Sequence, residues 1–138
     1  MLIGATPYEL KGVKIENMEW KEDTEVSGLH KFDIGIMPMP DNEWTRGKVG
    51  CKMLQYMANA VPAVVSYTPT NAEIIEDGVS GFLADSEKEW AEKMSLLIES
   101  QALRQKVGIS GRKTIEARFS LEVNSPRLKE LLENCIKN

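Results

Sequence analysis

Three cations and two glycines lie close together in the stretch RGKVGCK, Arg46 to Lys52. It leads into an apolar run, residues 51–59, whose spacing predicts a helix. The first N–H groups of a helix have no partner within it and lie at the positive end of the helix dipole. Glycines also let the main chain approach a ligand closely. The stretch therefore predicts a phosphate site, formed by Arg46, Gly47, Lys48, Val49, Gly50 and Lys52.

The alternative interpretation is that these cations are simply solvated loop residues. We favour the phosphate site, because a cation at a helix N-terminus costs roughly 0.3–1 kcal/mol and an anionic ligand offsets that cost. A nucleoside-triphosphate loop does not fit, since Lys48 is followed by Val49 rather than by Ser or Thr. The chain also has no G-x-G-x-x-G motif, which disfavours a dinucleotide dehydrogenase.

Composition limits the remaining classes. The 138 residues fit one globular domain, and the net charge of −4 argues against general affinity for nucleic acid or anionic membranes. Cys51 and Cys135 lie far apart, the chain has one histidine, and no zinc-type spacing occurs, so we expect reduced thiols and no metal. No apolar run has transmembrane length and no export signal is evident. A cytoplasmic protein is expected.

The elements that must position the phosphate site alternate along residues 1–85. Strands are predicted at residues 1–5, 13–18, 33–38, 63–66 and 82–84, with helices at 23–32, 51–59 and 72–76. From residue 86 onward the pattern is helical, with a capping pair at Ser86 and Glu89 and a last helix started by Ser125 and Pro126. This alternation predicts an α/β fold, a doubly wound parallel sheet of the Rossmann type (1–85), followed by a helical segment (86–138).

Several longer stretches resemble the C-terminal half of group 1 family glycosyltransferases, which have the GT-B architecture. The similar segments are FDIGIMPMPDNEW, GKVGCKMLQYMANAVPAVVS, NAEIIEDGVSGFLA, SEKEWAEKMSLLIES and LRQKVGISGRKTIEARFS. The resemblance implies a domain that holds a nucleotide-diphosphate sugar for transfer to an acceptor, usually with retention at the anomeric carbon and without an essential metal. Glycan or polysaccharide biosynthesis is the implied setting.

The resemblance also implies roles for single residues. Lys52 corresponds to the cation that binds the donor diphosphate. The family's two glutamates, which contact sugar and ribose, fall on Gly47 and Gln55, and Gln55 retains groups that hydrogen-bond ribose hydroxyls. Glu19 and Trp20 would lie near the nucleobase, although packing is the commoner role of such a tryptophan.

Two further departures from the family carry structural expectations. The family usually has glycine where this chain has Ala60, so we expect Asn59 to adopt the left-handed turn. By the same analogy the 1–138 unit is a partial domain, which lacks the N-terminal acceptor domain and one central strand. We therefore expect either that the strand Leu2–Ala5 shifts inward or that another chain fills the gap, for example in a homodimer through sheet edges.

The rival hypothesis is a non-catalytic interaction or scaffold domain derived from the same family. Loss of the glutamate pair favours this alternative, whereas the retained Lys52, Gln55 and glycine-containing loop favour donor binding. The chain by itself is expected to lack turnover, because acceptor and catalytic groups would lie on the absent domain.

Overall fold

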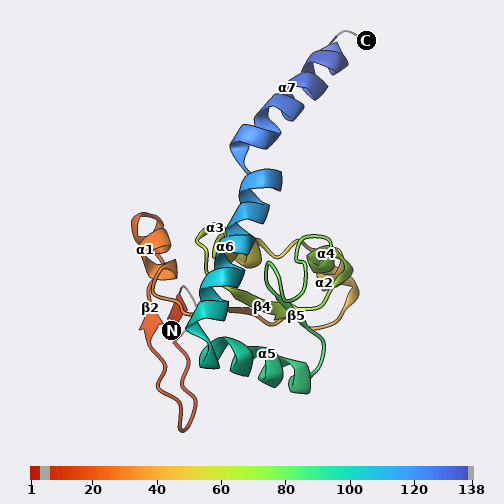
Figure 1. Ribbon diagram of the computed structural model, residues 1–138. Coiled ribbons are helices and arrows are strands. Elements are labelled where there is room, and N and C mark those ends of the chain that lie inside the picture. Colours follow the sequence, from red (N-terminus) through yellow and green to blue (C-terminus); the bar gives the residue numbers. More distant parts are fainter. Residues whose placement is uncertain (4–6, 137–138) are drawn as a thin grey trace.

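The computed structural model describes residues 1–3 and 7–136 (Figure 1). The predicted positions Gly4 and Ala5 lie outside the described residues. In chain order the elements are β1 (Leu2–Ile3), β2 (Asn17–Met18), the 3₁₀ turn η1 (Glu22–Thr24), α1 (Glu25–Leu29), β3 (Gly35–Met37), α2 (Glu43–Arg46), α3 (Cys51–Ala58), β4 (Ala63–Ser66), α4 (Pro69–Ala72), β5 (Phe82–Ala84), α5 (Glu87–Glu99), α6 (Gln101–Arg118) and α7 (Leu121–Ile136).

The strands form two separate parallel sheets. β1 pairs with β2, whereas β3, β4 and β5 form a second sheet in that order, with β4 in the middle. In Figure 1 the first sheet and α1 lie to the left of β4 and β5. The inward shift expected for the first strand is therefore wrong as far as β1 is described, because β1 pairs only with β2 and not with β3.

The second sheet is covered on both faces by helices. Val65 of β4 belongs to a core cluster with Met53 and Met57 of α3, whereas Val64 belongs to another with Leu97 of α5 and Val107 of α6. Alternate residues of a strand point to opposite faces, so each cluster fills one side of the sheet. The predicted α/β class, with helices flanking a parallel sheet and a helical C-terminal segment, is confirmed.

Two glycines let α6 pack directly against backbone atoms of two turns that precede strands β4 and β5. A Cβ atom on Gly108 would lie 2.0 Å from the carbonyl oxygen of Ala60, and one on Gly111 would lie 2.8 Å from that of Ser80. Both glycines are buried. Although glycine weakens a helix in isolation, α6 continues through both positions, because tertiary packing outweighs propensity here.

The turn after α3 differs from the expectation. Ala60 itself takes the left-handed conformation, with a φ of 56°, while Asn59 has a φ of −94°. Asn59 instead donates its side-chain Nδ2 to the carbonyl of Gln55. The prediction for Asn59 was wrong because this side-chain bond closes the last turn of α3, which moves the reversal to the next residue.

The N-terminal and C-terminal elements also correct the sequence prediction. Only Asn17–Met18 of the strand expected at 13–18 pairs, because Leu10 and Val13 bridge across a tight turn at Gly12, whose φ is 85°. The last helix begins at Leu121, with Pro126 inside it, and not at Ser125. In Figure 1, α7 extends away from the sheets, and none of its described residues is buried.

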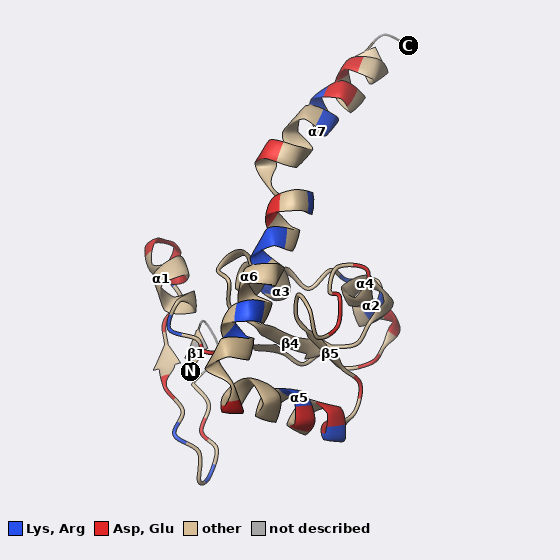
Figure 2. Ribbon diagram, in the orientation of Figure 1, with Lys and Arg blue, Asp and Glu red and all other residues tan. Residues whose placement is uncertain are grey.

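Acidic and basic residues are mixed along α5 and α7, whereas α6 is predominantly basic, with Glu116 as its one acidic residue (Figure 2). In the described part of the chain, no helix combines the length and apolarity that a membrane-crossing helix needs.

Replacing Gly108 with alanine tests the close contact of α6. We expect Gly108→Ala to lower the free energy of unfolding by about 1–3 kcal/mol, although alanine favours the helix, because the new methyl group collides with backbone atoms. Gly47→Ala is the matched control, since a Cβ there meets nothing within 4 Å. It should change stability by less than about 0.5 kcal/mol. Urea unfolding measures both, and equal effects of the two variants would contradict the packing argument.

Replacing Ala60 with glycine tests the strained turn. We expect Ala60→Gly to raise the free energy of unfolding by about 0.5–1 kcal/mol, because relief of the left-handed strain exceeds the entropy that glycine adds to the unfolded chain. Ala58→Gly, the same change inside α3, should instead destabilise by about 1 kcal/mol. Thermal or urea unfolding gives the two signs, and a destabilised Ala60→Gly would refute the strain.

Candidate functional site

The N-terminus of α3 lies at the edge of the sheet where the parallel strands end. Gly50 is the N-cap residue, and no side chain caps the helix, so its first N–H groups are left for solvent or a ligand. Lys52 lies in the first turn with its side chain 54% exposed. A Cβ atom on Gly50 would lie 2.2 Å from Cε of Met37, so this glycine allows α3 to start directly against β3.

Glu25 joins three of the predicted site residues. Its Oε1 atom accepts hydrogen bonds from Nε1 of Trp20 at 3.1 Å and from Nε2 of Gln55 at 3.0 Å. Nζ of Lys52 lies 3.9 Å from the same oxygen. The Glu25 side chain is 25% exposed, so its charge is partly withdrawn from water. We call Trp20, Glu25, Lys52 and Gln55 the polar cluster; it brings together the loop after β2, helix α1 and helix α3.

The polar cluster borders a hollow of about 410 Å³ between the two sheets. Trp20, Glu25 and Lys52 line it. Gln55 adds a further feature, because its Oε1 atom is buried and has no hydrogen-bond partner among the described residues. An unpaired buried carbonyl costs free energy that a hydroxyl donor would recover. The cluster thus offers an ammonium group, free helix N–H groups and amide and carboxylate acceptors.

The other cations of the predicted phosphate site are arranged differently. Arg46 forms a two-bond ion pair with Asp41, at 2.6 and 2.8 Å. This guanidinium hydrogen bond lowers the pKa of the Asp41 carboxyl, and the carboxylate raises the pKa of Arg46 in turn. The structure therefore pairs Arg46, the last residue of α2, with a carboxylate just before that helix, and Arg46 takes no part in the hydrogen bonds of the polar cluster. Lys48 and Val49 are exposed, and Gly47 ends α2.

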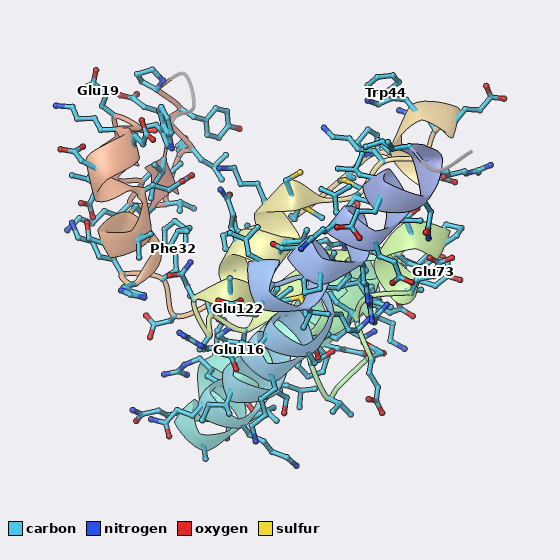
Figure 3. All side chains as sticks on the ribbon, turned by 90° about the horizontal axis from the view of Figure 1, so that it is seen from above. Glu19, Phe32, Trp44, Glu73, Glu116 and Glu122 are labelled. Carbon is cyan, nitrogen blue, oxygen red and sulfur yellow. The ribbon has the colours of Figure 1, made fainter. Side chains whose placement is uncertain are left out.

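Of the two residues expected beside a nucleobase, the structure brings only one to the hollow. Trp20 lines it, whereas Glu19 is 81% exposed and pairs with Lys21 at 3.5 Å. Figure 3 shows Glu19, which follows β2, at the outer end of the segment that contains α1, and Phe32, which follows α1, on the side that faces α3. Adjacent residues of an extended segment point in opposite directions, which explains the difference.

Sequence reasoning missed Glu25. Its partner Gln55 is 30 residues away in the chain, and no local spacing marks Glu25 among its acidic neighbours. The one available signal is that Glu25 follows Trp20 by five residues, within one turn-and-helix unit. Among residues 1–3 and 7–136 no group of three or more His, Cys, Asp or Glu could hold a metal ion.

Residues 2–100 match the family model described as glycosyl transferases group 1. The capsular polysaccharide biosynthesis glycosyltransferase CapM of Staphylococcus aureus is 27% identical over 86 residues, which cover 61% of this chain and 23% of CapM. The chain thus spans about a quarter of that relative's length.

Two solved structures have a similar fold. The C-terminal domain of a group 1 family glycosyl transferase (LpcC) from Francisella tularensis has a TM-score of 0.62 at 20% identity, over 76% of this chain and 54% of that one. Alr3699/HepE from Anabaena, in complex with UDP and glucose, has a TM-score of 0.74 at 18% identity, over 86% of this chain and 32% of that one. At these identities the likeness shows the fold.

A double-mutant cycle tests the link between α1 and α3 in the polar cluster. We expect Glu25→Ala and Gln55→Ala each to lower the free energy of unfolding by about 1 kcal/mol, and the double variant to cost about 1 kcal/mol less than their sum, because either change already breaks the shared bond. Glu25→Ala combined with Lys88→Ala on α5 is the control pair and should be additive within about 0.5 kcal/mol. Additivity of Glu25 and Gln55 would contradict the contact.

Proposed function

The chain belongs to the glycosyl transferases of group 1, and from that premise we propose that it binds the nucleotide-diphosphate sugar donor of a glycosyl transfer reaction. The observation that carries the proposal is the polar cluster: Trp20, Lys52 and Gln55, expected at the nucleobase, diphosphate and ribose, meet around one carboxylate beside an uncapped helix N-terminus.

Each part of the cluster suits one part of such a donor. The Lys52 ammonium and the free N–H groups of α3 would bind the diphosphate. The carboxylate of Glu25 and, once its side chain turns toward the hollow, the amide of Gln55 would hydrogen-bond ribose hydroxyls, and the Trp20 ring would lie against the base. In the free protein the Glu25 carboxylate is the counter-ion of the Lys52 ammonium group. When the donor binds, its diphosphate would replace Glu25 as the partner of Lys52.

The chemistry of transfer fits this arrangement. Negative charge builds on the diphosphate as the glycosidic bond breaks, and a fixed cation at that position stabilises the leaving group without a metal ion. We propose a retaining transfer to an acceptor held by another part of the protein, with no turnover by these 138 residues alone. The UDP and glucose bound to Alr3699/HepE support UDP-sugars as the first donors to test. The exposed free thiols of Cys51 and Cys135 suit a reducing, cytoplasmic setting.

A non-catalytic interaction domain is the second candidate. The observation that favours it is the exposed apolar side of α7, where Leu121, Leu128, Leu131, Leu132 and Ile136 are each more than half exposed. A scaffold would keep the fold but would not need a ligand at the polar cluster.

Thermal unfolding with UDP, UDP-glucose, UMP and uridine separates the two candidates. We expect UDP and UDP-glucose to raise the Tm by several degrees, because a ligand at about 100 times its Kd stabilises by about 2.7 kcal/mol. UMP should act more weakly and uridine hardly at all, since the diphosphate supplies the charge that Lys52 binds.

Lys52→Ala should remove most of the UDP effect, while Lys106→Ala, which removes an exposed lysine from α6, should leave it intact. If millimolar UDP, GDP and ADP and their sugar adducts all leave the Tm of the unsubstituted protein unchanged, donor binding is refuted and the scaffold candidate stands.

A further inference from the structure

The carboxylate of Glu25 is held through only one of its two oxygens. Oε1 accepts the hydrogen bonds from Nε1 of Trp20 and Nε2 of Gln55, and it is also the oxygen that lies 3.9 Å from Nζ of Lys52. Among the described residues, no donor is bonded to Oε2. An ionised carboxylate has about four acceptor positions on its two oxygens. Oε2 is therefore free to accept hydrogen bonds from a ligand.

The free oxygen belongs to a side chain whose position is fixed before a ligand binds. Glu25 lines the hollow and is 25% exposed, so a ligand can reach its carboxylate. The two donors to Oε1 come from the loop after β2 and from α3, and the carboxylate cannot turn away without breaking both hydrogen bonds. An acceptor held in this way loses little further side-chain entropy when a ligand binds to it.

The neighbours of Glu25 indicate which part of a donor would lie beside Oε2. This step rests on the proposed function, in which Trp20 lies against the base and Lys52 binds the diphosphate. Both residues reach Oε1 of Glu25, at 3.1 and 3.9 Å, so this carboxylate joins the base position to the diphosphate position. In a nucleoside diphosphate the pentose is the group between base and diphosphate. The pentose hydroxyls are therefore the groups that would meet Oε2.

A carboxylate oxygen distinguishes ribose from 2′-deoxyribose. Ribose has hydroxyl groups on two neighbouring ring carbons, and both can donate to the lone pairs of one oxygen atom. In 2′-deoxyribose one of these two donors is missing. Hydrogen bonds to an ionised acceptor are roughly twice as strong as those between neutral groups, so the missing hydroxyl is costly.

We propose that Glu25 makes the site selective for ribonucleoside diphosphates over 2′-deoxyribonucleoside diphosphates, with Oε2 as the acceptor for the 2′-hydroxyl. The donor is then a sugar adduct of a ribonucleotide such as UDP, GDP or ADP, and adducts of dTDP are excluded. Glu25 also has an opposing effect, because its charge competes with the diphosphate for Lys52. A ribonucleotide offsets this competition with its 2′-hydroxyl bond, whereas a deoxyribonucleotide lacks that bond.

Nucleotide pairs that differ by one hydroxyl group test the proposal. Isothermal titration calorimetry of the 138-residue protein would compare UDP with dUDP, GDP with dGDP and ADP with dADP, and the base with the highest affinity decides. We expect the ribonucleotide to bind at least tenfold more tightly than its deoxy partner, because one hydrogen bond to a charged group is lost.

Glu25→Ala shows whether this residue is the source of the selectivity. The variant should bind the ribonucleotide about tenfold more weakly, but the deoxyribonucleotide within about threefold of the unsubstituted protein, because relief of the competition for Lys52 offsets the remaining loss. A merely structural role of Glu25 would weaken both ligands alike. Glu22→Ala, which removes an exposed carboxylate three residues earlier, is the matched control and should keep the full selectivity.

A second variant covers the case in which Glu25→Ala does not fold. Glu25→Gln keeps an oxygen that can accept the hydrogen bonds of Trp20 and Gln55, so the local structure should persist. The selectivity for the ribonucleotide should still fall at least threefold, because the 2′-hydroxyl then donates to a neutral acceptor.

Failure of this inference and failure of the donor proposal give different results. If a ribonucleotide binds and its deoxy partner binds equally well, donor binding stands and the selectivity is refuted. Equal weakening of both ligands by Glu25→Ala, or tighter binding of dTDP than of UDP, GDP and ADP, would also refute the selectivity. If no nucleotide of either kind binds at millimolar concentration, the donor proposal is refuted and this inference with it.

Discussion

The pairing of β4 between β3 and β5 is the constraint on which the rest of the structure depends. β4 is the middle strand of a parallel sheet whose apolar side chains are covered on both faces, and Val64 and Val65 accordingly belong to different clusters. The cover on one face is α3, and on the other α5 and α6. Since α3 must return the chain from the end of β3 to the start of β4, its N-terminus lies where the strands end. The position of Lys52 thus follows from packing, before any ligand is considered.

The polar cluster joins α1 to α3, which covers the larger sheet, through charged and amide groups. Glu25 belongs to α1, whereas Gln55 and Lys52 belong to α3, and the hydrogen bond and ion pair between them bridge the rim of the hollow. Apart from Lys31 and Asp33, the rest of the hollow is lined by apolar side chains. An exposed ion pair contributes little to stability, but a partly buried carboxylate that accepts two side-chain hydrogen bonds fixes geometry. The cluster therefore sets the orientation of α1 more than it stabilises the fold.

Sequence reasoning succeeded where local pattern and packing agree. The helical spacing at 51–59 and the β-branched run at 63–66 predicted α3 and β4, and the same pattern placed Lys52 at a helix start. It failed where a contact across the chain decides the outcome. The role of Glu25 could not be predicted from its neighbours in the sequence, because its partner Gln55 lies 30 residues away. Arg46 pairs with Asp41 only five residues earlier, a local contact that the phosphate pattern did not include, and a role for Arg46 at a phosphate stays a prediction. The segment at 13–18 has strand-like residues, but only two of them find a neighbouring strand.

The glycines of α6 are a second case in which a contact between distant segments outweighs the local sequence pattern. Judged from the local sequence alone, Gly108 and Gly111 indicate a weak helix. The fold nevertheless requires glycine at both positions, because a Cβ atom would collide with the carbonyl oxygen of Ala60 or of Ser80. The left-handed Ala60 belongs to that same contact, since its carbonyl oxygen is the atom nearest to Gly108. The strain at Ala60 and the glycine in α6 are thus two consequences of one close approach. That approach holds α6 against the end of α3, and α3 in turn carries Lys52 and Gln55, so packing outside the polar cluster determines where its two members on α3 lie.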